Sequence, residues 1–195
     1  MSHMPITVWA FTSLVAIVAV QRLWELVRSR RHERALLARG GREHARGQMP
    51  WMSALHGSWL AAMILEVVLL GREARVGLAV VAGLVFLVGQ GLRLAAMSAL
   101  GERWTVRVIT VPGAPPVDRG IFRWLRHPNY LGVVLEIAAL PLVHGAWITA
   151  LVWSTANALL LVLRIRAEEA ALRTDNDDEA GLGDRPRFVP RLTSG

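Results

Sequence analysis

Five long runs of apolar residues alternate with short polar segments along the chain. They cover about Ile6–Val27, Pro50–Leu70, Val76–Leu100, Asn129–Val143 and Ala146–Leu163. A helix needs roughly 20 residues to cross the hydrocarbon core of a bilayer, and most of these runs provide them. The fourth run is short, so we expect it to be tilted or to cross only in part. The pattern predicts an all-α integral membrane bundle of about five transmembrane helices.

The last two runs are expected to form a helical hairpin, because Pro141 and Gly145 mark a turn between them. The length of 195 residues suits a single membrane domain over residues 1–195. The polar segment Arg28–Gln48 is expected to form a helix lying on the lipid headgroups. The stretch Thr174–Asp184, rich in Asp, is interpreted as a solvated acidic loop.

Arginine placement predicts the orientation of the bundle. The chain has 22 arginines and no lysine. Seven arginines lie between Arg28 and Arg46, five between Arg103 and Arg126, and six from Arg164 onward, whereas the opposite loops hold only Arg72 and Arg75. Positively charged loops stay on the cytosolic side. We therefore expect the N-terminus outside and the C-terminus in the cytosol.

Composition narrows the function classes. The chain is 53% hydrophobic with a mean hydropathy of +0.38, which suits a membrane protein whose charges lie in loops. It has no cysteine, so a disulfide framework and thiolate chemistry are excluded. The net charge of +7 comes from arginines that flank apolar spans, so we expect no nucleic-acid partner. The absence of lysine beside heavy use of Ala, Gly, Leu and Val is typical of a GC-rich bacterial genome, and the bacterial cytoplasmic membrane is the expected location.

Ionisable side chains inside the spans need a reason, since each costs about 2.5 kcal/mol or more when it is unsheltered in a bilayer. The candidates are Arg22, Glu25, His56, Glu66, Arg93 and Glu136. The first two stand three residues apart near the predicted cytosolic boundary, where snorkelling and mutual pairing account for them. His56 and Glu66 are interpreted as helix–helix hydrogen-bonding residues rather than catalysts. Arg93 and Glu136 are expected to pair with each other.

The sharpest polar constellation combines the start of the fourth helix with the end of the fifth. Its members are Arg126, His127, Pro128, Asn129, Tyr130, Arg164, Glu168 and Glu169. Pro128 suits the first helical position, so the next N–H groups are free for an anion, and Tyr130 offers its ring face to a cation such as a sulfonium. Arg164 and Glu168 are four residues apart and share a helical face. An interfacial cap with an ordinary surface ion pair explains the same spacing, and the residues alone leave both interpretations open.

At these residues the sequence resembles the isoprenylcysteine carboxyl methyltransferase family of integral membrane enzymes and its bacterial relatives. The resemblance covers about Arg93–Leu192. It rests on Arg126-His127-Pro128-Asn129-Tyr130-Leu131-Gly132 and Arg164-Ile165-Arg166-Ala167-Glu168-Glu169, with Leu100-Gly101, Trp104-Thr105, Gly120-Ile121-Phe122 and Arg187-Phe188-Val189-Pro190. Arg-His-Pro-x-Tyr followed by Arg-x-x-x-Glu-Glu is fairly specific for the group. The N-terminal half carries spans and no motif.

The resemblance implies a methyltransferase that uses S-adenosylmethionine (SAM), with a three-helix scaffold over residues 5–100 and a SAM-binding catalytic half over residues 101–195. In the family, the His-Pro-x-Tyr segment binds SAM, and the preceding loop and a C-terminal lid close the pocket. Phe122 departs from the Tyr that the family prefers, and the acidic tail between Leu172 and Arg187 lacks the family's aromatic residues. Carried over by position, the cofactor-binding residues are Ala114, Pro115, Pro116, Val117, Phe122, His127, Pro128, Asn129, Tyr130 and Glu168.

The resemblance also implies the roles of the two catalytic candidates. Arg164 contacts the substrate and holds an acidic oxygen, while Glu168 anchors SAM and can take a proton from a phenol or enol. The enzyme aligns an oxygen nucleophile with the SAM methyl and excludes water; S-adenosylhomocysteine is the product, and no metal is expected. The expected acceptor comes from the membrane lipid and enters between helices. It is a long-chain phenol, pyrone or quinone-like lipid, or a prenylated carboxylate.

Two other function classes stay open. Membrane reductases of the sterol-reductase type resemble the same C-terminal half and use NADPH, but they have a larger bundle of spans. A small membrane adaptor or transporter subunit is the non-enzymatic candidate. A transporter should carry polar residues or broken helices at mid-membrane, whereas this polar cluster is predicted at the cytosolic rim. The oligomeric state is not predicted.

The predicted orientation can be tested directly, because the chain has no cysteine of its own. A cysteine introduced at Ser2 should react with an impermeant thiol reagent from the periplasmic side, and one at Ser194 should not. Labelling of Ser194→Cys but not of Ser2→Cys would show that the orientation is the reverse of the predicted one. The proposed site would then face away from the cytosol.

Overall fold

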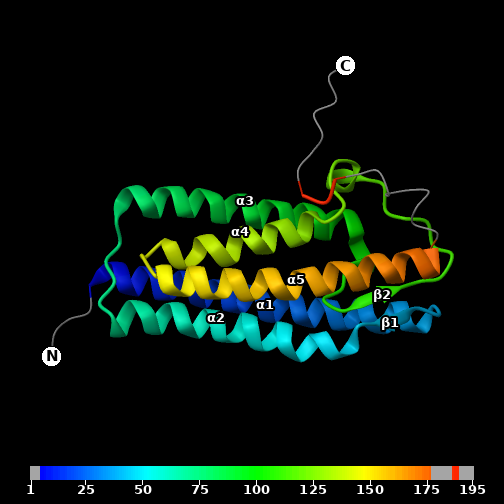
Figure 1. The fold of residues 1–195 in the computed structure, drawn as a ribbon, viewed down its shortest axis with the longest axis horizontal. Coiled ribbons are helices and arrows are strands. Elements are labelled where there is room, and N and C mark those ends of the chain that lie inside the picture. The colour runs from blue at the N-terminus through cyan, green and yellow to red at the C-terminus, as the bar shows by residue number, and fades with distance from the viewer. Residues whose placement is uncertain (1–4, 177–185, 189–195) are drawn as a thin grey trace, which may run out of the picture.

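Five helices lie roughly along one axis in the computed structural model, which describes residues 5–176 and 186–188 (Figure 1). They are α1 Ile6–Ala38, α2 Met49–Leu69, α3 Val76–Leu100, α4 Pro128–Leu142 and α5 Trp147–Asn176. Four of them are long and apolar enough to cross a membrane, and α4 is a shorter apolar helix. The predicted all-α bundle with a short fourth helix is confirmed. The side that each terminus faces and the division at residues 100 and 101 stay predictions.

Two helices extend beyond their predicted ends. α1 continues through Arg28 to Ala38, because no Gly or Pro interrupts it before Gly40. The helix expected over Arg28–Gln48 is thus confirmed only to Ala38, as a continuation of α1, and its position on the lipid headgroups stays a prediction. α5 likewise continues past Leu163 to Asn176. The acidic residues 177–184 and the Val189-Pro190 pair lie outside the described residues.

A small antiparallel sheet, absent from the prediction, lies at one end of the bundle. β1 (Arg42–His44) pairs with β2 (Val108–Thr110), and Glu43 stands opposite Ile109. This pairing ties the segment after α1 to the segment after α3. We call this the β end of the bundle; the first residues of α1 lie at the opposite end (Figure 1). Strands of three residues are too short for alternation of side chains to reveal them in a sequence.

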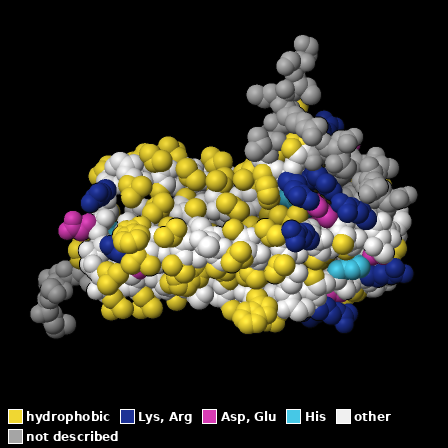
Figure 2. Space-filling model, in the orientation of Figure 1, with side chains coloured by type: hydrophobic (Ala, Val, Ile, Leu, Met, Phe, Trp, Pro, Cys, Tyr) yellow, Lys and Arg dark blue, Asp and Glu magenta, His cyan; other side chains and the backbone are white. Residues whose placement is uncertain are grey.

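The bundle presents an apolar surface between two charged ends. Figure 2 shows hydrophobic side chains over the middle of the visible face, with basic side chains gathered at the β end and a smaller charged group at the other end. Ile17, Leu84 and Leu151 are examples of large apolar side chains that are at least 60% exposed. An apolar surface of this extent is suited to lipid rather than water. The chain is thus an integral membrane protein.

Helices α3 and α4 pack closely, backbone against backbone. A Cβ atom added to Gly132 would lie 2.6 Å from the carbonyl oxygen of Gly89 and 2.5 Å from Cγ of Arg93. One added to Gly89 would lie 2.9 Å from the carbonyl oxygen of Gly132. Small residues at both positions therefore permit this approach, as they do at many helix interfaces in membranes. The approach brings Arg93 within reach of Glu136.

A network of four buried charges joins α1, α3 and α4. Arg93 donates from Nη2 to Glu25 at 2.6 Å and from Nη1 to Glu136 at 3.3 Å. Arg22 donates to Glu25 at 2.9 Å and also to Glu136. The predicted pair of Arg93 and Glu136 is confirmed. The mutual pairing predicted for Arg22 and Glu25 is confirmed, but the predicted snorkelling was wrong, because the Glu25 residue is 3% exposed and binds two arginines inside the bundle.

The other two ionisable residues in the spans behave differently from each other. Glu66 accepts hydrogen bonds from the backbone N–H and the hydroxyl of Thr149, both at 2.7 Å, and from Nε of Arg72 at 3.0 Å. Its predicted role between helices is confirmed. His56 instead uses Nδ1 to bind the carbonyl oxygen of Met52 in its own helix, at 2.8 Å. The interpretation of His56 as a helix–helix residue was wrong.

The close approach of α3 and α4 predicts the effect of one methyl group. Gly132→Ala should destabilise the protein by about 1–3 kcal/mol, because the new Cβ meets backbone rather than a movable side-chain tip. Gly83→Ala in α3 is the matched control, since nothing lies within 4 Å of its added Cβ. Thermal melting in one detergent measures both variants. Equal melting temperatures for the two variants would contradict the argument.

Candidate functional site

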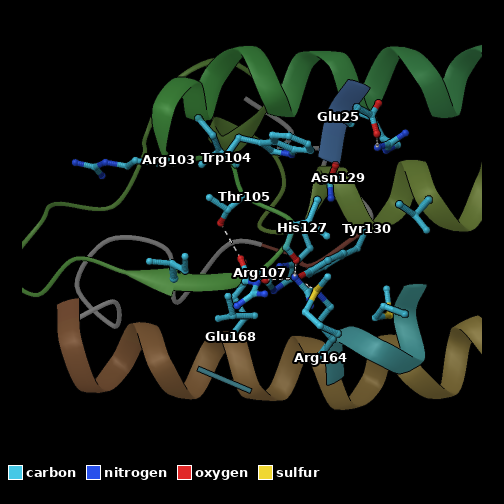
Figure 3. A pocket seen from close by; sticks show the side chains of 18 of the residues that line it. Glu25, Arg103, Trp104, Thr105, Arg107, His127, Asn129, Tyr130, Arg164 and Glu168 are labelled. Atoms are coloured by element: carbon cyan, nitrogen blue, oxygen red, sulfur yellow. Dashed lines mark hydrogen bonds and ion pairs between the residues drawn. The ribbon is translucent and has the colours of Figure 1, made fainter. Parts of the chain in front are cut away.

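A cavity of about 570 Å³ lies between the helices at the β end, in the size range of small-molecule sites (Figure 3). Side chains from all five helices line it, together with residues of the loops before α4. Every residue that the sequence analysis assigned to cofactor binding or catalysis lines this one cavity: Ala114, Pro115, Pro116, Val117, Phe122, His127, Pro128, Asn129, Tyr130, Arg164 and Glu168. The hairpin of α4 and α5 brings the start of one helix beside the end of the other. The functions of these residues stay predictions.

Tyr130 joins the two catalytic candidates. Nε of Arg164 donates to the Tyr130 hydroxyl at 3.0 Å, and that hydroxyl donates to the Glu168 carboxylate. The guanidinium carbon of Arg164 lies 5.8 Å from the centroid of the Tyr130 ring. Within the described chain, Arg164 and Glu168 form no ion pair with each other, and Arg164 is 6% exposed. An ordinary surface ion pair is therefore not what the structure contains.

The segment of residues 104–111, here called the roof loop, covers part of the cavity. Arg164 donates from Nη2 to the carbonyl oxygen of Val106, and the Val106 N–H donates to the Ser29 hydroxyl at 2.8 Å. His32 of α1 binds the carbonyl oxygen of Trp104 at 2.7 Å. The roof loop is thus held by α1 and α5 together. The sequence analysis expected the loop before His127 to close the pocket but did not predict these contacts, because they use backbone groups that any residue possesses.

Glu169 fastens both the start of α4 and the segment 186–188. His127 Nε2 lies 3.0 Å from one carboxylate oxygen of Glu169, and Arg187 donates to the same carboxylate at 2.8 and 2.6 Å. These hydrogen bonds and the negative charge of Glu169 raise the pKa of Arg187 above its usual value. The His127 ring also stacks on Tyr130, with centroids 5.5 Å apart. The sequence analysis included Glu169 in the constellation but gave it no function of its own.

Backbone contacts reinforce the same attachment. The N–H groups of Arg126 and His127 donate to the carbonyl oxygens of Pro186 and Arg187, at 3.1 and 3.3 Å. Phe188 packs against the apolar cluster of Tyr130 and its neighbours in α5. Residues 186–188 therefore lie against the loop-to-helix junction that the sequence analysis singled out. Coverage of the site by the C-terminal segment stays a prediction.

A second polar cluster attaches the end of α5 to the sheet. The Asp175 carboxylate accepts hydrogen bonds from Thr110, from His44 at 2.9 Å and from Arg42 at 3.0 Å. Its side chain is 1% exposed. The interpretation of Asp175 as part of a solvated acidic loop was wrong, because β1 and β2 provide partners for it. The cluster holds β2, and with it the roof loop, over the cavity.

Asn129 presents a buried acceptor to the site. Its Oδ1 atom has no hydrogen-bond partner among the described residues, although the side chain lines the cavity. Buried polar atoms are normally paired, so this oxygen suits an N–H donor of a ligand. Asn129 also lies in the first turn of α4, where backbone N–H groups have no partner within the helix. One short segment therefore offers both an acceptor and donors.

Comparison with known proteins gives a consistent result. A family model described as "Isoprenylcysteine carboxyl methyltransferase (ICMT) family" matches residues 80–174. The "Uncharacterized protein YpbQ" of Bacillus subtilis (strain 168) is 34% identical over 163 residues, which cover 84% of this chain and 96% of the relative. An "Uncharacterized protein" of Haemophilus influenzae is 30% identical over 162 residues, covering 80% of this chain and 91% of the relative. Similarity to these two relatives thus extends into the N-terminal half.

The role of Glu169 predicts how the 186–188 segment responds to a mutation. Glu169→Gln should release this segment and raise the rate of tryptic cleavage after Arg187 about tenfold, since a hydrogen bond to a charged group contributes about 1.5–3 kcal/mol. Mass spectrometry of timed digests measures the rate. Glu102→Gln is the control, because Glu102 belongs to an exposed pair with Arg39. Unchanged cleavage in Glu169→Gln would remove Glu169 from this role.

Proposed function

Because the chain belongs to the isoprenylcysteine carboxyl methyltransferase family, a membership that indicates a membrane methyltransferase, we propose that it is a SAM-dependent O-methyltransferase acting on a lipophilic acceptor. One observation carries the proposal. His127, Tyr130, Arg164 and Glu168 line a single cavity, and Tyr130 links the last two by hydrogen bonds. The methyl donor and the acceptor class are parts of the proposal.

The residues around the start of α4 fit SAM. The unpartnered Oδ1 of Asn129, judged within the described residues, suits an N–H of the amino acid part or the adenine. The N-terminus of α4 suits a carboxylate, and the Tyr130 ring suits a cation such as the sulfonium. Pro115, Pro116 and other apolar side chains form a wall for the adenosine. Bound SAM supplies an activated methyl group, while these residues hold it and exclude water.

Arg164 is positioned to hold the acceptor oxygen. Its Nε and Nη2 atoms are occupied by Tyr130 and by the Val106 carbonyl oxygen. Its Nη1 atom has no partner in the described part of the chain and is not among the buried unpaired atoms, so it keeps accessible surface. A guanidinium fixed at two nitrogens, with a third available, is organised in advance to orient an acidic oxygen. Glu168, fixed by Tyr130, is the proposed anchor for SAM.

The remaining lining suits an apolar tail. Leu23, Leu60 and Leu161 are among the side chains that α1, α2 and α5 contribute to the cavity away from the roof loop. We propose that the tail of a long-chain phenol, pyrone or quinone-like lipid, or of a prenylated carboxylate, enters between helices here. The proposed location is the bacterial cytoplasmic membrane. The β end then faces the cytosol, where SAM is available.

Calorimetric titration of the purified protein tests the proposed cofactor. S-adenosylhomocysteine should give a saturable binding signal, and NADPH should give none. Binding of NADPH without S-adenosylhomocysteine would instead support a membrane reductase. Binding of neither compound would favour the non-enzymatic adaptor.

The proposed division of work between Arg164 and Glu168 leads to different defects. Arg164→Leu should keep S-adenosylhomocysteine binding but lower turnover about 100-fold, because the acceptor oxygen loses the group that orients it. Arg164→Lys should restore only part of the activity, because a point charge lacks the planar fork. Glu168→Gln should instead weaken S-adenosylhomocysteine binding about tenfold. Calorimetry and a methyl-transfer assay measure the two effects.

Arg166→Leu is the matched control for charge, since Arg166 is exposed on the same helix. It should alter neither binding nor turnover. Equal losses of thermal stability in Arg164→Leu and Glu168→Gln, with methylation retained in both, would show that the two residues only support the end of α5.

A further inference from the structure

His56 lines the cavity and has no part in the function proposed above. Its Nδ1 atom lies 2.8 Å from the carbonyl oxygen of Met52, and a carbonyl oxygen only accepts. Nδ1 therefore carries the proton, and Nε2 of the neutral ring has a lone pair. Nε2 has no hydrogen-bond partner in the described chain, and it is not among the buried unpaired atoms. It thus keeps accessible surface and is available to a ligand.

Helix geometry places His56 below Arg164, on the side away from the roof loop. Gln48, just before α2, donates to the carbonyl oxygen of Leu163 at 3.5 Å, so α2 and α5 are level there. His56 follows eight residues later, about 12 Å further along the axis. Side chains of a helix lean toward its N-terminus, and α2 and α5 run in opposite directions. His56 therefore leans toward the β end, where Arg164 reaches the roof loop, and both side chains line the cavity.

We propose that Nε2 of His56 is the general base that accepts the proton of a neutral phenol or enol during methylation. This inference rests on the methyltransferase function proposed above. The acceptor O–H bond breaks and its proton moves to Nε2, while the oxygen forms a bond to the methyl carbon. The carbon–sulfur bond breaks with its electron pair moving to sulfur, which leaves the neutral thioether S-adenosylhomocysteine. The imidazolium then returns the proton to water.

Of the two candidate bases, Glu168 is already engaged, whereas Nε2 of His56 is not engaged by any described residue. The Glu168 carboxylate already accepts the Tyr130 hydroxyl proton, and it is the proposed anchor for SAM. The charged groups that act on His56 are Arg22 of α1 and Arg164 of α5. Arg22 is already bound by Glu25 and Glu136, whereas Arg164 retains its accessible Nη1 atom. Arg164 can thus hold the acceptor oxygen while His56 removes its proton.

A base of this kind also selects the class of acceptor. A phenol has a pKa of about 10, so it needs a proton acceptor near neutral pH, whereas a carboxylate has no proton to give up. The assignment therefore points to long-chain phenols and enols rather than prenylated carboxylates. It adds to the proposed function a choice between phenol or enol acceptors and carboxylate acceptors, which an experiment can decide.

The test compares wild type with His56→Asn on two acceptors of equal chain length. One is an alkylphenol that is protonated near neutral pH; the other is its ring-fluorinated analogue, which is already ionised. The Asn amide nitrogen can keep the bond to Met52, but it lacks the far ring nitrogen. Turnover of the alkylphenol should fall about 100-fold, and turnover of the ionised analogue should change little. S-adenosylhomocysteine binding and the melting temperature should match wild type.

A spectroscopic measurement provides a readout that does not need turnover. A long-chain nitrophenol is added to protein with S-adenosylhomocysteine, in buffer acidic enough to keep the free compound protonated. Wild type should produce the phenolate absorption band, and His56→Asn should not. Ser58→Ala is the matched control in α2, because Ser58 lies outside the cavity and binds Trp153. It should behave as wild type in both measurements.

The possible failures are distinguishable. Equal loss on both phenols, or no loss on either, would overturn the role of His56 while leaving the methyltransferase intact. A wild-type protein that methylates a fatty acid of the same length but neither phenol would do the same. If the wild type neither binds S-adenosylhomocysteine nor methylates any acceptor, the proposed function itself is rejected, and the base with it.

Discussion

Charged side chains inside an apolar bundle need partners, and the network of Arg22, Glu25, Arg93 and Glu136 meets this need within the molecule. Each arginine binds both carboxylates, so the two positive and two negative charges balance inside the bundle. Removing one partner from such a network typically costs about 3–5 kcal/mol, because it leaves an uncompensated charge. The network fixes α1 against the close pair α3 and α4, and the positions of the other elements follow from that arrangement.

The cavity is bounded by two polar layers that serve different purposes. Arg22, Glu25 and Arg93 of the charge network form part of its inner wall. At the β end, Glu169 and Asp175 attach the C-terminal segment and the sheet to α5. Between these layers lie Tyr130, Arg164 and apolar side chains, so a ligand meets both polar and apolar groups in the cavity. This arrangement suits an amphiphilic acceptor and a polar methyl donor bound side by side.

Much of this could be predicted from the sequence, because helix length and helix spacing follow simple rules. The hairpin turn and the four-residue spacing were sufficient to bring Tyr130, Arg164 and Glu168 together. The sheet was missed because three-residue strands carry no readable alternation. The contacts of Glu169 were not predicted, since the spacing along the helix does not show that this side chain faces His127 and Arg187. The surroundings of Glu25 were predicted wrongly because the depth of this residue in the membrane was predictable, but the side of the helix that it occupies, facing lipid or protein, was not.

The charge network has a consequence for how the chain is made. Glu25 enters the membrane with α1, but its partner Arg93 lies 68 residues later in the chain. Glu136, the second partner of Arg22, lies 114 residues after Arg22. Until α3 has been synthesised, Arg22 and Glu25 of the first helix can satisfy only each other, and Glu136 becomes available only with α4. The first helix to leave the ribosome therefore reaches its final environment only after the fourth has been inserted. The four-charge network is therefore complete only when α1, α3 and α4 are all present.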